Sequence, residues 1–344
     1  MQIDPLSAHD FGARISGIVL SQLDAQDFKA VYGAFLKYGF IVFPDQALTE
    51  VEQITFGERF GALEFGALPL ANQIKLEDGG YSEIFPVASQ RMQTNLGNEA
   101  WHTDSTYWPV SSKCALLTAV KVPDEGGQTE LADLRAGYRS LSDEMKARIH
   151  GLSAYHSTQY SQAHDLGHYP DPRPGSLYHG EAYLRALVKV HPETGEPNLF
   201  IGRHAFGIPG LSRSESRALL QDLVDFVVSD PARVYQHQWC VGDTLLWDNR
   251  ALLHRARPYD YAQPRVLIGT RVAVTCHQSW PIILLTPKPK PGAERSNGNW
   301  LCSDPALSGR KAKVPAWLEA AQHSKQPFGC HLARLAVRTR QSLG

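Results

Sequence analysis

The spacing of hydrophobic residues predicts helices and a buried strand near the start of the chain. Between residues 28 and 36, apolar side chains recur at intervals of three and four, as on one face of a helix that ends at Gly39. The apolar run at residues 40–43 then predicts a buried strand. Helices are also expected after Thr49 and Ser212, because each is followed three positions later by Glu, the pattern of a capping box.

Strand-like runs dominate the rest of the first 274 residues. Short runs rich in β-branched and aromatic residues, several of them bounded by Gly, Pro or Asp, predict strands at residues 115–122, 129–132, 198–202, 233–238, 244–247 and 265–274. Many short strands with a few helices at their margins favour a sandwich or a jelly roll over alternating βαβ units. We therefore predict a mainly β fold with flanking helices.

Two segments differ from this pattern. Residues 151–190 are rich in His, Tyr, Pro, Gly and Ser and have little periodicity, which predicts a long loop or insertion that acts as a lid. Residues 275–344 contain Pro-rich stretches and no recognisable motif, and a helix is expected at 315–324. We expect one domain at residues 1–274 and a C-terminal extension, 275–344, packed on it.

Composition excludes several classes of protein. The 344 residues, 43% of them hydrophobic, can bury a large core. The net charge of −1 gives no overall field that would attract nucleic acid or an anionic membrane. The five cysteines include no C-x-x-C pair, and the chain has neither a signal-peptide pattern nor an apolar run long enough to span a bilayer. We expect a cytoplasmic protein with reduced thiols that binds no nucleic acid and no membrane.

Candidate metal ligands occur in two segments. His102 and Asp104 are two residues apart, so in a strand both side chains would lie on one face. This spacing alone is a weak signal, because the pairs at 179/181 and 191/193 are also a histidine and a carboxylate two residues apart. With His254, the pair would form the facial triad of two histidines and one carboxylate that binds non-haem iron(II) and leaves positions for a 2-oxo acid and dioxygen.

A 2-oxoglutarate ligand also needs a partner for its distal carboxylate. Arg265 lies eleven residues after His254 on the next predicted strand, and a guanidinium binds a carboxylate through two parallel charge-assisted hydrogen bonds. Thr129, on another predicted strand, can add a hydroxyl donor. An ordinary salt bridge for Arg265 and a packing role for Thr129 are the alternative interpretations.

The motifs around these residues resemble the taurine dioxygenase and 2,4-dichlorophenoxyacetate dioxygenase family. WHTDSTY, GGQTELAD, HPETGEPNLFIGRHAFGIPGLS and WDNRALLHRARPYD followed by PRVL fall in the family's order, over about residues 5–275. The resemblance implies a double-stranded β-helix (jelly roll), with catalytic iron ligands His102, Asp104 and His254, and with Thr129 and Arg265 binding 2-oxoglutarate. It implies a dioxygenase that uses Fe(II), 2-oxoglutarate and O2 to hydroxylate a small anionic organic substrate, producing succinate and CO2.

The substrate residues are less well defined by the resemblance. Family members that bind anions often carry a second arginine four residues beyond the cofactor arginine, and here that position is Gly269. Arg271 would project to the same face of a regular strand and is a candidate anchor for a substrate that is a carboxylate or another anion. Further candidates for lining the pocket are Asn98, Arg203 and His204, and a purely structural role is the alternative for each.

Other functions remain open at this point. The triad could bind another divalent ion in a non-redox hydrolase or isomerase, or the chain could be an inactive binding protein on the same scaffold. Where the hydroxylated carbon bears an ether, sulfonate or amine, the product would collapse and release that group, so cleavage as well as hydroxylation is open. The resemblance also leaves a homo-oligomer open.

Overall fold

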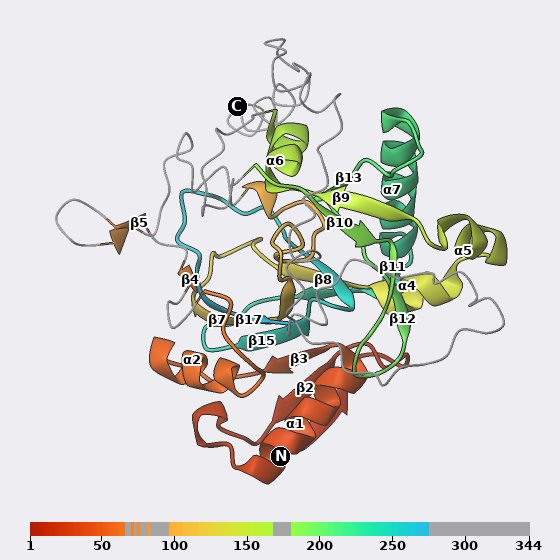
Figure 1. The fold of residues 1–344 in the computed structure, drawn as a ribbon. Coiled ribbons are helices and arrows are strands. Elements are labelled where there is room, and N and C mark those ends of the chain that lie inside the picture. Colours follow the sequence, from red (N-terminus) through yellow and green to blue (C-terminus); the bar gives the residue numbers. More distant parts are fainter. Residues whose placement is uncertain (66–69, 72–73, 76–80, 83–95, 168–179, 275–344) are drawn as a thin grey trace, which may run out of the picture.

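A computed structural model describes residues 1–65, 70–71, 74–75, 81–82, 96–167 and 180–274 (Figure 1). Its largest sheet has seven strands, which are antiparallel except for the parallel pair β2 and β3. In spatial order they are β1 (Gln2–Pro5), β2 (Ala13–Ser16), β3 (Phe40–Phe43), β15 (Thr244–Asp248), β7 (Ser112–Lys121), β17 (Val266–Ala273) and β4 (Leu70–Ala71).

A second sheet faces the large one. It is antiparallel, with β8 (Thr129–Asp133) between β14 (Val234–His237) and β16 (Leu252–Ala256). Side chains from both sheets, such as Trp247, Leu131 and Leu252, form one buried apolar cluster. Because alternate residues of a strand point to opposite faces, His254 lies on the same face of β16 as Leu252, toward the space between the sheets.

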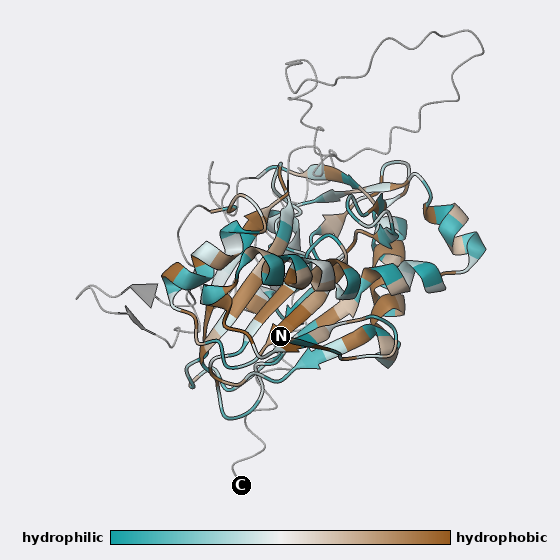
Figure 2. Ribbon diagram, turned by 90° about the horizontal axis from the view of Figure 1, so that it is seen from below, coloured by the Kyte–Doolittle hydropathy of each residue, from teal (hydrophilic) through white to brown (hydrophobic). Residues whose placement is uncertain are grey.

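Helices cover the outer faces of both sheets. On β15, Leu245 and Trp247 point between the sheets, and Leu246 points the other way, into a cluster shared with α1 (Ala25–Tyr38) and α2 (Glu50–Glu58). The outer face of the smaller sheet packs on α4 (Leu134–Ser140) and α7 (Arg213–Val228). Figure 2 shows the central strands as mostly hydrophobic and the helices as a mixture of hydrophilic and hydrophobic residues, as expected of helices that bury one face.

The remaining elements are short. They are 3₁₀ helices η1 (Leu20–Gln22) and η2 (Pro231–Arg233), helices α5 (Asp143–Ile149) and α6 (Thr158–Leu166), and strands β5 (Ile74–Lys75), β6 (Tyr81–Ser82), β9 (Ser153–His156), β10 (Tyr183–Ala186), β11 (Val188–Val190), β12 (Pro197–Leu199) and β13 (Ala205–Phe206). No helix in the described ranges combines the length and the apolar character that crossing a membrane requires.

The three helices expected from periodicity are confirmed, together with their end signals. Gly39 caps α1 with a left-handed φ of 78°, a conformation that glycine adopts without steric cost. Thr49 and Ser212 each form the expected capping box, with Glu52 and Glu215 respectively. The mainly β prediction is also confirmed.

One predicted strand is shorter than expected. The run at 198–202 forms strand only as far as Leu199, the end of β12. The chain leaves the strand before Gly202, where φ is 124° and a Cβ would lie 3.2 Å from the Cα of His102. This close approach to the candidate metal ligand requires glycine and ends the regular strand.

The expectation of a long loop at residues 151–190 was wrong for the described part of that segment. It contains β9, α6, β10 and β11, and β9 pairs with β10. Polar composition was misleading because polar residues are buried here with partners: His156, for example, bonds the hydroxyl of Thr106 at 2.9 Å. Residues 168–179, the extension 275–344 and the helix expected at 315–324 lie outside the described residues.

Candidate active site

The three predicted metal ligands meet between the two sheets. His102 and His254 form an isolated antiparallel bridge, in which the N–H of each residue donates to the carbonyl of the other, at 3.0 and 2.8 Å. Asp104 follows two residues later, and one potential ligand atom from each of the three residues lies within 4.8 Å of the others. All three residues are buried. The structure therefore brings together the residues that the sequence singled out.

The protonation states suit a divalent cation. Burial lowers the pKa of His102 well below its ordinary value, and burial lowers the pKa of His254 to about 4, so both rings are neutral near pH 7. Burial alone would raise the pKa of Asp104, but the positive charge of Arg271 and the nearby histidines hold it below its ordinary value. Two neutral imidazoles and one carboxylate form the donor set that metal binding requires.

A hydrogen bond also orients His102. The Nδ1 of His102 lies 2.8 Å from the carbonyl oxygen of Ala100, which leaves Nε2 for a metal. The Nε2 of His254 lies 3.5 Å from Oδ2 of Asp104. In the described part of the chain, no other cluster of three His, Cys, Asp or Glu side chains has this geometry. The residues therefore fit an iron(II) ion.

Arg265 and Thr129 suit the distal carboxylate of 2-oxoglutarate. Arg265 is buried; its Nε donates to the carbonyl of Gly127 at 2.9 Å, and no carboxylate among the described residues pairs with it. Burial lowers its pKa to about 10, so it remains a cation near pH 7. A buried cation needs an anionic partner. Thr129 is also buried, and its hydroxyl oxygen accepts a hydrogen bond from Trp239 at 3.0 Å.

Arg271 lies beside the triad. Its Nη2 is 2.6 Å from Oδ1 of Asp104, and it hydrogen-bonds Tyr107. The ring of Phe65 lies 5.9 Å from its guanidinium carbon. The sequence predicted that Arg271 and Arg265 would share a face of the strand, and both are directed inward. The ion pair with Asp104 was not foreseen, because the sequence does not reveal how β17 is aligned with its neighbours.

The other candidate substrate residues have different surroundings. The ring of His204 lies 6.1 Å from that of His102, and its Nδ1 is 2.9 Å from the hydroxyl of Ser161. The backbone carbonyl of Asn98 accepts the N–H of Ala256 at 2.8 Å. The ring of His204 therefore lies near the triad, whereas Asn98 contacts the end of β16 through its backbone.

Arg203 pairs with Asp165 and lines a cavity that is separate from the triad. It forms an ion pair of 2.6 Å with Asp165. It lines a cavity of about 640 Å³ between α6 and α7, and none of the three candidate metal ligands lines that cavity. These contacts favour the structural interpretation of Arg203.

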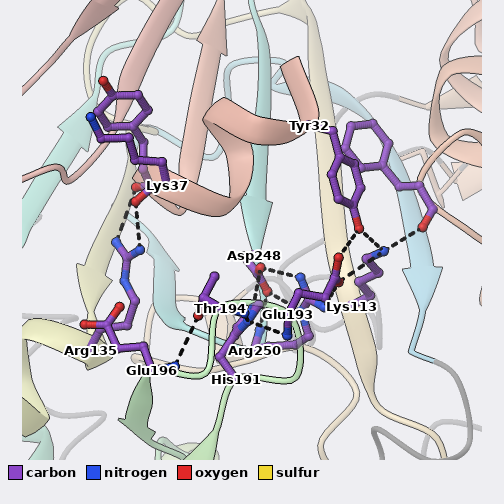
Figure 3. A network of polar contacts seen from close by, with 12 residues as sticks. Tyr32, Lys37, Lys113, Arg135, His191, Glu193, Thr194, Glu196, Asp248 and Arg250 are labelled. Carbon is purple, nitrogen blue, oxygen red and sulfur yellow. Dashed lines mark hydrogen bonds and ion pairs between the residues drawn. The ribbon is translucent and has the colours of Figure 1, made fainter. Parts of the chain in front are cut away.

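The competing pair His191 and Glu193 has structural contacts instead. The Nε2 of His191 lies 3.0 Å from Asp248, and Glu193 pairs with Arg250 (Figure 3). Both residues are therefore held in a polar network and do not join the triad. His179, of the second competing pair, lies outside the described residues.

Comparisons with known proteins agree with this geometry. Residues 2–271 match the family model described as "Taurine catabolism dioxygenase TauD, TfdA family". A "(S)-phenoxypropionate/alpha-ketoglutarate-dioxygenase" of Sphingobium herbicidovorans is 45% identical over 276 residues, which are 79% of this chain and 94% of that protein. An "Alpha-ketoglutarate-dependent 2,4-dichlorophenoxyacetate dioxygenase" of Cupriavidus pinatubonensis is 33% identical over 247 residues, covering 66% of this chain and 82% of that one.

Solved structures are similar as well. The structure of "AAD-2 in complex with Mn(II) and N-oxalylglycine" has a TM-score of 0.73 and 35% identity, and the match covers 80% of this chain and 98% of that chain. A putative 2,4-D dioxygenase from Burkholderia xenovorans has a TM-score of 0.67 and 30% identity, with 79% and 96% of the two chains covered.

The chain belongs to the TauD/TfdA dioxygenase family. It is a 2-oxoglutarate-dependent dioxygenase, with Fe(II), 2-oxoglutarate and O2 as its metal and co-substrates. The alternatives of a non-redox metal enzyme and of an inactive binding protein find no support in these comparisons.

Proposed function

We propose that the enzyme oxidises a small aryloxyalkanoate, a carboxylate whose adjacent carbon bears an aryl ether. Two observations support this substrate class. The relatives named above include dioxygenases for phenoxypropionate and 2,4-dichlorophenoxyacetate. In this chain, a guanidinium and aromatic side chains lie together beside the triad.

The position of the Arg271 guanidinium beside the triad is the observation that carries the proposal. Its guanidinium can bind a substrate carboxylate through paired hydrogen bonds. The rings of Phe65 and Tyr107 lie next to it and offer apolar surface for an aryl group. A carboxylate held at Arg271 would bring its neighbouring carbon close to Asp104, which Arg271 contacts.

The proposed roles divide between metal, co-substrate and substrate. His102, Asp104 and His254 hold the iron, and Arg265 and Thr129 hold the distal carboxylate of 2-oxoglutarate. The bound Fe(II) with 2-oxoglutarate supplies the oxidising chemistry, in which one atom of O2 enters succinate and CO2 is released. The other oxygen atom is inserted into the C–H bond of the ether-bearing carbon, whose hydrogen ends up on the new hydroxyl, and the resulting hemiketal or hemiacetal collapses to a phenol and a 2-oxo acid.

We also propose that the two facing sheets form a double-stranded β-helix and that residues 1–274 form one domain, with 275–344 as an extension. The segment 151–190 is proposed to cover the site. Arg185 of β10 supports this role, because its guanidinium donates to the carbonyl oxygens of Thr106 and Trp108, close to Asp104 in the chain. A cytoplasmic location is supported by the free thiols of Cys114 and Cys240.

The test is an assay of purified enzyme with Fe(II), 2-oxoglutarate and O2. Phenoxyacetate and both enantiomers of 2-phenoxypropionate are supplied, and phenol and succinate are measured together. We expect one phenol per succinate with at least one of the three substrates, and no phenol with the Asp104→Ala variant. Succinate formation without phenol from any of these substrates would contradict the proposed substrate class.

A further inference from the structure

We propose that Asn249 is a positioning residue, whose side-chain amide fixes the orientation of the Asp104 carboxylate at the metal. The inference rests on the proposed role of Asp104 as a ligand. Asn249 lies in the turn between β15 and β16, and its side chain is fully buried. Neither the sequence motifs nor the spacing of the ligands singled it out.

All hydrogen-bonding groups of the Asn249 amide are used. Its Oδ1 accepts the backbone N–H of Asp104 and the indole N–H of Trp247, each at 3.2 Å. Its Nδ2 donates to Oδ2 of Asp104 at 3.3 Å and to the hydroxyl of Ser112 at 3.1 Å. Because the backbone and indole N–H groups can only donate, they fix which end of the amide is the oxygen. The NH2 group must then face the carboxylate.

The two oxygens of Asp104 have different partners. Oδ2, which Asn249 contacts, is the oxygen that lies 3.5 Å from Nε2 of His254. Oδ1 is 2.6 Å from Arg271. The terminal torsion of an aspartate is broad, so a carboxylate without such partners would rotate and exchange its oxygens. Asn249 therefore holds the oxygen that faces the histidine ligand.

The turn that carries Asn249 is itself held by buried charges (Figure 3). Asp248 accepts hydrogen bonds from the backbone N–H and Nε of Arg250, at 2.9 and 2.8 Å, and lies 3.0 Å from Nε2 of His191. Arg250 also pairs with Glu193, which accepts the hydroxyl of Tyr32. We call these five residues the Asp248 network. The backbone N–H of Asn249 donates to the carbonyl of Lys113 at 3.0 Å, which anchors the turn to β7.

This arrangement links the network to the metal site through one side chain. Buried ion pairs are weak evidence for added stability, and fixing one conformation is a better-supported role for them. Here the fixed conformation is that of the turn, and Asn249 transmits it to Asp104. Removing a residue that hydrogen-bonds a metal ligand typically changes metal affinity by about 10- to 100-fold.

The experiment measures Mn(II) binding by electron paramagnetic resonance, without turnover, in wild type, in Asp104→Ala and in three further variants. Asn249→Ala removes all four contacts of the amide. Asn249→Asp keeps the two acceptor contacts and replaces the NH2 donor by a carboxylate oxygen, so that a negative charge faces Asp104 where the hydrogen bond was. Ser112→Ala is the matched control, because it removes the other acceptor of the same NH2 group and leaves the contact with Asp104 in place. Circular dichroism and the melting temperature establish that each variant folds.

We expect Mn(II) to bind about 10- to 100-fold more weakly to both Asn249 variants and within about twofold of wild type to Ser112→Ala. The visible band of the anaerobic Fe(II) and 2-oxoglutarate complex should also shift in both Asn249 variants, which a merely structural role would not produce. Wild-type affinity and an unshifted band in folded Asn249→Asp would overturn the proposal. If Asn249→Ala fails to fold, Asn249→Asp decides.

Failure of the proposed role of Asp104 as a metal ligand would look different. In that case wild type itself would neither bind Mn(II) through Asp104 nor form the visible band, and Asp104→Ala would behave like wild type. If only the Asn249 proposal fails, wild type still binds Mn(II), and binding is lost only in Asp104→Ala.

Discussion

Removing the guanidinium of Arg265 should weaken the binding of 2-oxoglutarate far more than it affects any other step of the reaction. Arg265 is 7% exposed, and no carboxylate among the described residues neutralises it. Its depressed pKa of about 10 reflects the cost of burying this cation. A dicarboxylate that binds there offsets this cost and gains charge-assisted hydrogen bonds.

The expected loss of 2-oxoglutarate affinity follows from the burial of the Arg265 guanidinium and the carboxylate that it would bind. Removing one partner of a buried, hydrogen-bonded charge pair costs about 2 to 5 kcal/mol, or roughly 30- to 5,000-fold in the dissociation constant. Arg265→Met should fall in this range, because it keeps an apolar chain against Gly127 and removes the charge. Arg265→Lys should lie between Arg265→Met and wild type, because an ammonium keeps the charge but cannot donate two parallel bonds.

The assay is anaerobic titration of Fe(II)-loaded protein with 2-oxoglutarate, followed by the visible band. Arg255→Met is the matched control: Arg255 pairs with Glu130 and lines the separate cavity beside α7. A melting scan adds a second readout, since 2-oxoglutarate at 100 times its Kd should stabilise wild type by about 2.7 kcal/mol. Equal losses of affinity in Arg265→Met and Arg255→Met, or wild-type affinity in Arg265→Met, would refute the assignment of Arg265.

Three stability predictions follow from other contacts. Tyr32→Phe removes the 2.6 Å hydrogen bond to Glu193 and the 2.7 Å hydrogen bond from Lys113, and it should lower the free energy of unfolding by about 1 kcal/mol in urea titrations; no change would mean that these two bonds together add nothing. Burial would raise the pKa of Asp248, but Arg250 and His191 hold it well below its ordinary value. The ionised carboxylate therefore stabilises the folded protein above about pH 4, and this stabilisation is lost as the pH falls further. Asp248→Asn should therefore be less stable at pH 7 and lose less stability than wild type between about pH 4 and pH 2; parallel curves would contradict this. Gly97→Ala places a Cβ 2.3 Å from Nη1 of Arg203, so it should break the pair with Asp165 and lower stability by about 1 to 3 kcal/mol; an unchanged melting temperature would show that Arg203 moves without cost.

Local signals in the sequence predicted the parts of the fold that depend on local physics. The capping boxes at Thr49 and Ser212 and the left-handed Gly39 place helix ends correctly, because each depends on residues within one turn. The prediction of a loop at residues 151–190 was wrong for the opposite reason. Its strand β9 is held by partners far away in the chain, such as Ala205 and Phe206 of β13, which no local pattern reveals.

The metal ligands could be predicted because their chemistry restricts the residue types. Two histidines and a carboxylate with a downstream arginine form a combination that few other roles require. The structure adds that the ligands from two segments meet through the backbone bridge between His102 and His254. The sequence placed Asp104 and His254 in the same site without indicating this pairing.

The surroundings of Asp104 could not be predicted, because they depend on distant segments that meet only in the folded chain. Arg271 reaches one carboxylate oxygen because β17 pairs with β7 in a register that a bulge shifts at each end. Asn249 reaches the other because the turn before β16 is fixed by polar contacts with the segment that contains His191 and Glu193. In the sequence, Asn249 is one polar residue in a turn, where asparagine is common for purely local reasons. Its proposed function becomes visible only when the two hydrogen-bond donors that orient its amide, and the carboxylate that the amide faces, are known together.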